Sequence, residues 1–285
     1  MLSRRGFVAT ALGAAVSTRM DAARLRGLKI GVTDWNLRQA AKIEAVGLAS
    51  RLGFQGVQIS LGREVQNDKL PLDNSDLIAN YLRTSKQFDI PLNGTCLDVL
   101  HVNYLKNDKL GQKWVVDGIR LTKALGTRVM LLPFFGKGTL ATDEEKNYVG
   151  DVLRELGPEA EKAGVILGLE NTISAEDNVR ILDRAKSKAL LVYYDISNST
   201  KAGFNVVREI EWLGKKRICQ MHIKDNPHYL GEGTIDVADV LRAVSRIGWE
   251  GFANLETDSP SKSVEADMKR NLAFVRRTIV EVERS

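Results

Sequence analysis

Residues 165–171 read V-I-L-G-L-E-N, a short apolar run that ends on a carboxylate, Glu170, just where the chain turns polar. Three later stretches have the same form, because each apolar run delivers one metal-capable side chain close to its C-terminal end. If the four runs are neighbouring parallel strands, these side chains converge on one mouth, where (β/α)8 barrels place their chemistry. The three later stretches are residues 190–196 (L-L-V-Y-Y-D-I) with Asp195, residues 218–225 (I-C-Q-M-H-I-K-D) with His222, and residues 251–257 (G-F-A-N-L-E-T) with Glu256.

From residue 28 onward, apolar runs of strand length alternate eight times with amphipathic stretches of helix length. This alternation indicates a parallel sheet with crossover helices, and eight such units are what a closed barrel requires. No low-complexity segment or linker interrupts the series. We therefore predict a single-domain α/β fold, a (β/α)8 TIM barrel, over residues 26–285. The expected strands are residues 29–33, 56–61, 91–97, 128–133, 165–171, 190–196, 218–224 and 251–256.

Several of the intervening helices carry capping signals. Thr142 and Glu145 have the spacing of a capping box, Asp236 can cap a later helix, and Asn74 or Ser75 can cap an earlier one. The expected helices are residues 40–52, 75–88, 109–125, 143–163, 175–186, 206–213, 237–247 and 264–283.

The N-terminus has the pattern of an export signal. Residues 3–8, S-R-R-G-F-V, resemble a twin-arginine motif, and residues 7–16 form an apolar run too short for a stable membrane span. We therefore expect residues 1–25 to be a twin-arginine signal segment. The barrel would then be exported to the periplasm or the extracellular space. This route carries folded proteins, often with a metal already installed, which suits a metalloenzyme.

Composition limits the partners of the chain. It is 44% apolar and 27% charged, as in a soluble globular protein. Removing residues 1–23 takes away three basic residues and one acidic residue, which lowers the formal charge from +5 to +3. So small a charge gives no case for binding nucleic acid or for stable membrane insertion. Cys96 and Cys219 fall in the third and seventh expected strands, on opposite sides of a barrel, so we expect two free, buried thiols.

The four strand-end residues form a ligand set of three carboxylates and one imidazole. Such a mostly hard set suits Mn²⁺ or Mg²⁺ best, with Co²⁺, Fe²⁺ or Zn²⁺ also able to bind. A single glutamate at a strand end is more often a helix cap or a surface acid, and a single histidine is more often structural. Four such residues at the ends of consecutive strands favour a site for one divalent metal ion.

Five segments around these residues resemble the xylose isomerase-like barrel superfamily, particularly its sugar phosphate isomerase/epimerase branch. The resemblance extends from residue 28 to the C-terminus and implies one divalent metal held by Glu170, Asp195, His222 and Glu256. It also implies a carbohydrate substrate. The five segments are L-E-N (169–171), Y-Y-D-I-S-N (193–198), M-H-I-K-D (221–225), G-E-G-T-I-D (231–236) and N-L-E-T (254–257).

The resemblance also implies a mechanism. The metal would stabilise the negative charge that develops when a proton leaves the carbon next to a ketose carbonyl. In the ketose epimerases, the residues that match Glu170 and Glu256 take and return this proton from opposite faces of the substrate. The residue that matches Glu176 contacts a substrate hydroxyl, although an acid in the first turn of a helix is also favoured by the helix dipole.

Three positions depart from the epimerase pattern. Asn198 stands where the epimerases usually carry a histidine, His228 stands where they often carry an arginine, and Gln58 stands where many relatives place a glutamate. Each change replaces a charged or titrating group expected around the substrate. The metal site is therefore better specified by the sequence than the substrate is.

Three further residues are weaker candidates for substrate contacts. Lys224 can act as an electrophile or bind a substrate oxygen, or it can simply pair with Asp225. His101 can reach the mouth from the loop after the third strand, or it can be a solvated loop residue. Trp35, after the first strand, can form an apolar wall for a sugar ring or pack across the barrel end.

The leading hypothesis is thus a metal-dependent isomerase or epimerase that removes a proton next to a carbonyl of a small-molecule carbohydrate. A 3-keto-glycoside lyase or hydratase would use the same metal and base and then expel the aglycone. An apurinic endonuclease relative is disfavoured, because the chain has only three histidines. A non-catalytic sugar-binding barrel is disfavoured by the intact carboxylates. Relatives are often dimers or tetramers, so a homo-oligomer stays open.

Overall fold

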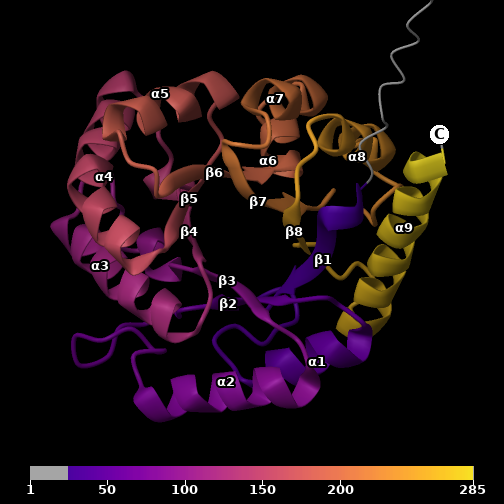
Figure 1. Ribbon diagram of the computed structural model, residues 1–285, viewed down its shortest axis with the longest axis horizontal. Coiled ribbons are helices and arrows are strands. Elements are labelled where there is room, and N and C mark those ends of the chain that lie inside the picture. Colours follow the sequence, from indigo (N-terminus) through magenta and orange to yellow (C-terminus); the bar gives the residue numbers. More distant parts are fainter. Residues whose placement is uncertain (1–24, 285) are drawn as a thin grey trace, which may run out of the picture.

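The structure is a computed structural model that describes residues 25–284, so the expected signal segment lies outside the described residues except for Leu25. Eight parallel strands close into a barrel in chain order, and β1 pairs with β8 to complete the ring (Figure 1). The predicted (β/α)8 barrel is confirmed. The strands are β1 Leu28–Thr33, β2 Val57–Ser60, β3 Leu92–Cys96, β4 Val129–Pro133, β5 Ile166–Glu170, β6 Leu190–Asp195, β7 Ile218–Ile223 and β8 Gly251–Leu255.

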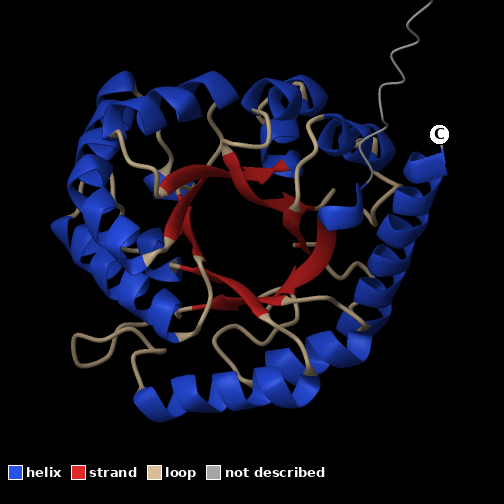
Figure 2. Cartoon of the chain, in the orientation of Figure 1, coloured by secondary structure: helices blue, strands red, loops and turns tan. Residues whose placement is uncertain are grey.

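The helices form an outer ring around the strands (Figure 2). Among the described residues, no helix is both long enough and apolar enough to cross a membrane. The α-helices are α1 Glu44–Leu52, α2 Ser75–Phe88, α3 Lys109–Ala124, α4 Asp143–Ala163, α5 Ala175–Ala185, α6 Ile196–Lys201, α7 Val206–Leu213, α8 Val237–Arg246 and α9 Val264–Arg284. Short 3₁₀ turns add η1 Leu25–Gly27, η2 Asp98–His101 and η3 Gly136–Gly138.

Local capping chemistry sets several helix starts as the sequence predicts. Thr142 and Glu145 form the complete capping box of α4. The side chain of Asn74 accepts a hydrogen bond from the backbone at the start of α2, and that of Asp236 does so at α8. Such bonds satisfy backbone N–H groups that have no partner within a helix.

Two helix predictions need correction. The first helix begins at Glu44 rather than at residue 40, because the chain forms a turn here in which Asp34 Oδ2 accepts the N–H of Ala41 at 2.9 Å. The prediction also missed the short helix α6, which starts directly after β6. Its N-cap is Asp195, whose Oδ1 accepts the N–H groups of Ser197 and Asn198. A candidate metal ligand thus also caps a helix.

The barrel has an aliphatic layer outside the sheet and a largely polar interior. Leu, Ile and Val side chains fill the space between the strands and the helices. Inside the ring, a chain of buried amides and a phenol replaces the branched aliphatic layers that usually fill such barrels. These residues are Gln58, Asn93, Tyr193, Gln220 and Asn254. The barrel interior can therefore hold polar groups of the site in place from below.

Candidate metal centre and active-site cavity

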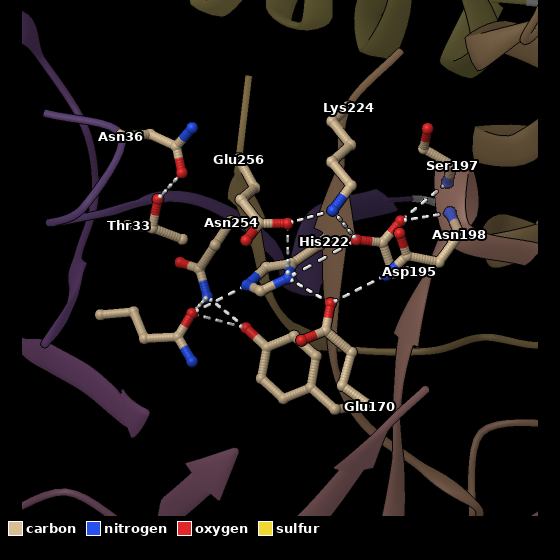
Figure 3. A network of polar contacts seen from close by, with 12 residues as sticks. Thr33, Asn36, Glu170, Asp195, Ser197, Asn198, His222, Lys224, Asn254 and Glu256 are labelled. Atoms are coloured by element: carbon tan, nitrogen blue, oxygen red, sulfur yellow. Dashed lines mark hydrogen bonds and ion pairs between the residues drawn. The ribbon is translucent and has the colours of Figure 1, made fainter. Parts of the chain in front are cut away.

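The strand register brings the four predicted ligands to one place at the C-terminal mouth. Glu170 and Asp195 are the last residues of β5 and β6, and Asp195 lies opposite His222 of β7. Glu256 follows β8 directly. One ligand atom from each residue lies within 4.8 Å of the others, a spacing that one metal ion can bridge (Figure 3).

His222 Nδ1 stands at the centre of this group. It lies 2.9 Å from Glu170 Oε1, 3.2 Å from Glu256 Oε2 and 3.7 Å from Asp195 Oδ2. The His222 side chain is fully buried, and 4% of the Glu170 side chain and 16% of the Glu256 side chain are exposed. Three carboxylates held this close in a buried site repel one another, so the arrangement needs positive charge.

The surroundings of Asp195 already hold a positive charge. Asp195 Oδ2 is buried, and its partner is the ammonium of Lys224, whose Nζ lies 2.7 Å away as an ion pair. The same Lys224 ammonium contacts Glu256 Oε2. The donor set of three carboxylates and one imidazole, facing inward from rigid strand ends, suits one divalent metal ion.

In the metal-free protein, bound protons and the ammonium of Lys224 offset the negative charge of the carboxylates. Burial raises the pKa of Glu170 to about 7, against the effect of His222 and with the help of Glu256. The pKa of His222 is also raised, because the attraction of Glu256 and Glu170 outweighs its burial. The positive charges of His222 and Lys224 outweigh burial and hold the pKa of Glu256 well below its usual range. The raised pKa values favour proton binding at Glu170 and His222, and a metal ion would compete with those protons.

Gln58 lies below the site and determines which nitrogen of His222 carries the hydrogen. Gln58 Nε2 donates to the backbone carbonyl of Thr95 at 3.4 Å, so Gln58 Oε1 must point the other way. That oxygen lies 2.9 Å from His222 Nε2 and accepts the hydroxyl of Tyr193 at 3.0 Å. His222 Nε2 therefore carries a hydrogen, and Nδ1 is left to bind a metal.

This arrangement corrects the place expected for Gln58. The sequence comparison assigned it to the surroundings of the substrate, but Gln58 is completely buried and belongs to the barrel interior beneath His222. Asn254 completes the layer by donating to Tyr193 Oη at 2.8 Å. Sequence reasoning missed Tyr193 and Asn254, because neither type of residue in a strand signals a contact with a metal ligand.

Three predicted contact residues lie at the site. Trp35 Nε1 donates to Glu256 Oε1 at 2.9 Å, and its ring meets that of His222 edge-on with centroids 5.9 Å apart. Asn198 Nδ2 donates to Glu170 Oε1 at 3.3 Å. Trp35, Asn198 and Lys224 all line the cavity above the four candidate ligands. They can hold the two glutamates in position and face a bound substrate.

A cavity of about 620 Å³ opens above the four ligands and extends across the barrel mouth. Glu170 and Glu256 line one side of it, and His101 lines the other side, stacked on Phe135 with ring centroids 6.2 Å apart. Burial lowers the pKa of His101. The structure thus places His101 at the mouth, where the loop position allowed it to be.

Glu176 and His228 do not line this cavity. Glu176 is exposed at the start of α5 and borders a separate hollow beside Trp212. His228 is exposed in a turn where its backbone N–H donates to the carbonyl of Asp225 at 2.9 Å. The substrate contacts that the epimerase pattern predicts for these two residues therefore stay predictions.

Sequence reasoning also missed several residues that line the cavity. Ser60 is the last residue of β2, and Arg63, Asp98 and Phe135 lie in the loops that follow β2, β3 and β4. Asp98 had a usable signal, because it comes two residues after the strand-ending Cys96, much as the metal ligands end their own strands. Ser60, Arg63 and Phe135 had none, since their residue types at a strand end do not indicate a particular chemistry.

The two cysteines are free, as predicted. They belong to β3 and β7, on opposite sides of the ring, which prevents a disulfide between them. Cys96 is buried as expected. Cys219 is partly exposed as a residue, but its Sγ donates to the backbone carbonyl of Val192 at 3.3 Å, and burial raises the pKa of its thiol to about 12. A register shift in the pairing of β6 with β7 lies at this residue.

The chain belongs to the xylose isomerase-like TIM barrel family, whose model matches residues 46–278. An uncharacterized protein of Methanocaldococcus jannaschii is 28% identical over 163 residues, which are 48% of this chain and 55% of that protein. The match thus spans about half the length of that relative. The family places this barrel among proteins of the fold predicted from the sequence.

Solved structures share the whole barrel at low sequence identity. An L-ribulose 3-epimerase has a TM-score of 0.73 and 17% identity over 90% of this chain and 96% of its own. A 3-keto-D-glucoside 4-epimerase from E. coli has a TM-score of 0.70 and 17% identity, and the match covers 88% of this chain and 99% of that one. The IOLI protein with a bound zinc atom has a TM-score of 0.67 and 19% identity over 90% and 98%. The structural neighbours are thus sugar epimerases and a zinc-binding barrel, and at these identities the likeness shows the fold.

Proposed function

We propose that this protein is a divalent-metal-dependent isomerase or epimerase that removes a proton next to the carbonyl of a keto-sugar. The observation that carries the proposal is the meeting of Glu170, Asp195, His222 and Glu256 beneath a cavity that two of the four also line. Sugar epimerases among the structural neighbours support it. Mn²⁺ or Mg²⁺ is the preferred metal, because three of the four ligands are carboxylates.

The metal would be held by Glu170, Asp195, His222 Nδ1 and Glu256. When bound, it supplies a Lewis acid that polarises the substrate carbonyl and makes the neighbouring C–H more acidic. Asp195 is the least suited to move a proton, because its Oδ1 caps α6. His222 Nε2 is bonded to Gln58 and faces away from the cavity.

Glu170 and Glu256 are therefore the proposed acid–base pair. Both line the cavity. Glu170 is the last residue of β5 and Glu256 directly follows β8, so the two approach a substrate from different directions. Asn198 holds one oxygen of Glu170, and Trp35 holds Oε1 of Glu256. One glutamate would take the proton from the substrate carbon, and the other would return a proton to the opposite face.

Lys224 favours a second candidate reaction, elimination from a 3-keto-glycoside. Its ammonium lines the cavity beside Glu256 and can donate a proton to an oxygen that leaves the sugar. The first step would again be proton removal by a glutamate. The bond to the aglycone would then break instead of the carbon being reprotonated. An apurinic endonuclease relative is the less favoured alternative, because His222 is the one histidine in the cluster of candidate metal ligands found within residues 25–284.

The test is a screen of the purified, Mn²⁺-loaded protein against free ketoses and 3-keto-glycosides in D₂O. An epimerase gives an epimer that carries deuterium at the reacting carbon, whereas a lyase releases the aglycone. The matched control is Glu176→Gln, because Glu176 is an exposed glutamate outside the cavity. Absence of both deuterium uptake and release from every keto-sugar, with the metal bound, would contradict the proposal.

We also propose that residues 1–25 direct export by the twin-arginine route. The support is the S-R-R-G-F-V motif and the short apolar run that follows it. Replacing Arg4 and Arg5 together by lysine should retain the protein in the cytoplasm, as measured by cell fractionation. Unchanged export of this double variant would contradict the proposal.

A further inference from the structure

The cavity is wider than one sugar ring bound at the metal requires. Its lining comes from both halves of the barrel: Glu170 and Glu256 belong to the half built by β5–β8, whereas Asp98 and His101 follow β3. Its volume of about 620 Å³ lies in the middle of the range of about 300–1,000 Å³ found for pockets that bury drug-sized ligands.

The barrel geometry separates the two ends of the cavity. In the closed ring, β3 stands opposite β7, the strand that carries His222 (Figure 1). Eight strands spaced about 4.8 Å apart and tilted by about 36° give a ring about 15 Å across. A pyranose whose carbonyl reaches the four metal ligands does not also fill the side next to β3.

The side next to β3 has the chemistry of a carbohydrate subsite. Asp98 lines the cavity, and its Oδ2 accepts the hydroxyl of Ser60 at 2.6 Å, which fixes the carboxylate in one orientation. Carboxylates, arginines and hydroxyls hydrogen-bond sugar hydroxyls, and Arg63 lines the same region. His101 and Phe135 both line this side of the cavity, and an aromatic ring there can pack against the C–H face of a second sugar ring.

We propose that the substrate has two rings, as a glycoside or disaccharide whose keto ring lies over Glu170 and Glu256 while its second ring lies on Asp98, His101 and Phe135. This inference rests on the proposed function and specifies its substrate class. We call the residues Ser60, Arg63, Asp98, His101 and Phe135 the second-ring subsite. Substrates that fill it gain hydrogen bonds and aromatic contact that a single ring lacks.

The test compares methyl 3-keto-glucoside, which has one ring, with 3-keto-cellobiose, which has two. Deuterium uptake or product release gives kcat/KM for each substrate. The measured quantity is the ratio of kcat/KM for the two-ring substrate to that for the one-ring substrate. The wild-type ratio should be well above 1. In Asp98→Asn and in Phe135→Ala the ratio should fall by roughly 10-fold, the size expected for loss of one charged hydrogen bond or aromatic contact. Asp76→Asn, an exposed acid on α2, should keep the wild-type ratio.

Binding provides a second measurement that does not require turnover. Unreacted cellobiose should give saturation-transfer NMR signals on both rings with the wild-type protein, and Asp98→Asn should weaken those of one ring. A wild-type kcat/KM ratio near 1, a ratio unchanged in both variants, or no cellobiose signal would overturn the second-ring subsite. Loss of deuterium uptake from both substrates while cellobiose still binds through Asp98 would instead count against the proposed function and leave the subsite supported.

Discussion

The two halves of the barrel use the same strand-end positions for different purposes. In the half built by β5–β8, the strand ends carry Glu170, Asp195, His222 and Glu256, which converge on one point. In the half built by β1–β4, two aspartates stand at similar positions, but they do not join the cluster. Asp34 is completely buried, and its Oδ2 accepts the N–H groups of Ala41 and Ser60.

This comparison shows that a carboxylate at a strand end is not enough to make a metal ligand. Burial raises the pKa of Asp34, with a further contribution from the negative charge of Asp98. In the cluster of β5–β8, by contrast, the positive charges of Lys224 and His222 stand next to the carboxylates. What distinguishes the ligands is that consecutive strands deliver four of them together, with positive charge nearby.

The largest expected difference between the halves is between His222, buried among the four candidate ligands, and His101, which lines the cavity. His222→Ala should abolish metal binding and activity, because it removes the nitrogen at the centre of the cluster. His101→Ala, in the other half, should retain the metal at wild-type stoichiometry. Metal content after dialysis and circular dichroism measure binding and folding. Full metal occupancy in folded His222→Ala would contradict the assignment of His222 as a metal ligand.

The next difference concerns the two glutamates. Glu170→Gln or Glu256→Gln should lower turnover by about 10²–10⁴-fold, the usual loss for a general base, and weaken metal binding only moderately. In D₂O, the variant that lacks the abstracting base should show no deuterium uptake, whereas the other can exchange the proton without completing the reaction. Glu176→Gln is the matched control. Wild-type exchange and turnover in both variants would move the acid–base chemistry to Lys224 or His101, which also line the cavity.

Gln58 links the halves, because it belongs to β2 but contacts His222 of β7. Gln58→Leu should weaken metal binding by about 10–100-fold, since the imidazole loses the bond that fixes its hydrogen on Nε2. Gln220→Leu removes a similar buried amide that donates instead to the carbonyl of Asn93. Titration calorimetry with Mn²⁺ compares the two. Equal losses would mean that the interior network acts only through overall stability.

The smallest expected effect is the pH dependence of metal affinity and of folding stability. The pKa of Glu170 is about 7, so a cation displaces a proton below that pH, and affinity should rise by up to about tenfold per pH unit for each proton released. Without metal, the folded chain holds this proton more tightly than the unfolded chain, so stability should fall as pH rises from about 4.5 to about 7. The raised pKa of His222 acts in the same direction. Calorimetry in two buffers measures the protons released on metal binding, and thermal melting in EDTA measures the stability of the metal-free protein. A metal affinity that does not change with pH would contradict this competition between metal and protons.

The sequence predicted the barrel and the residues of the cluster, because both depend on short-range patterns. Apolar runs that alternate with amphipathic stretches report strands and helices directly, and a ligand at a strand end is visible as such. The second-ring subsite and the Gln58 bond were not predictable in this way. Both depend on side chains from strands far apart in the sequence, such as Gln58 and His222, whose contact is set by the closure of the ring.

Helix α6 and the position of Glu176 show where local patterns fail. The six residues of α6 are too few for helical periodicity to appear, and its cap, Asp195, had already been assigned to the metal. Glu176 matches a substrate contact of the epimerases by its spacing from Glu170. In the structure, it is an exposed acid in the first turn of α5, the position that the helix dipole favours.

Anomalous diffraction from crystals of the Mn²⁺-loaded protein tests the central claim most directly. The account predicts one strong manganese peak enclosed by Glu170, Asp195, His222 Nδ1 and Glu256, with Lys224 Nζ moved away from Asp195 Oδ2. It also predicts that the peak disappears in His222→Ala. A protein that binds manganese in solution but shows no peak among these four residues, or a peak elsewhere, would contradict the account.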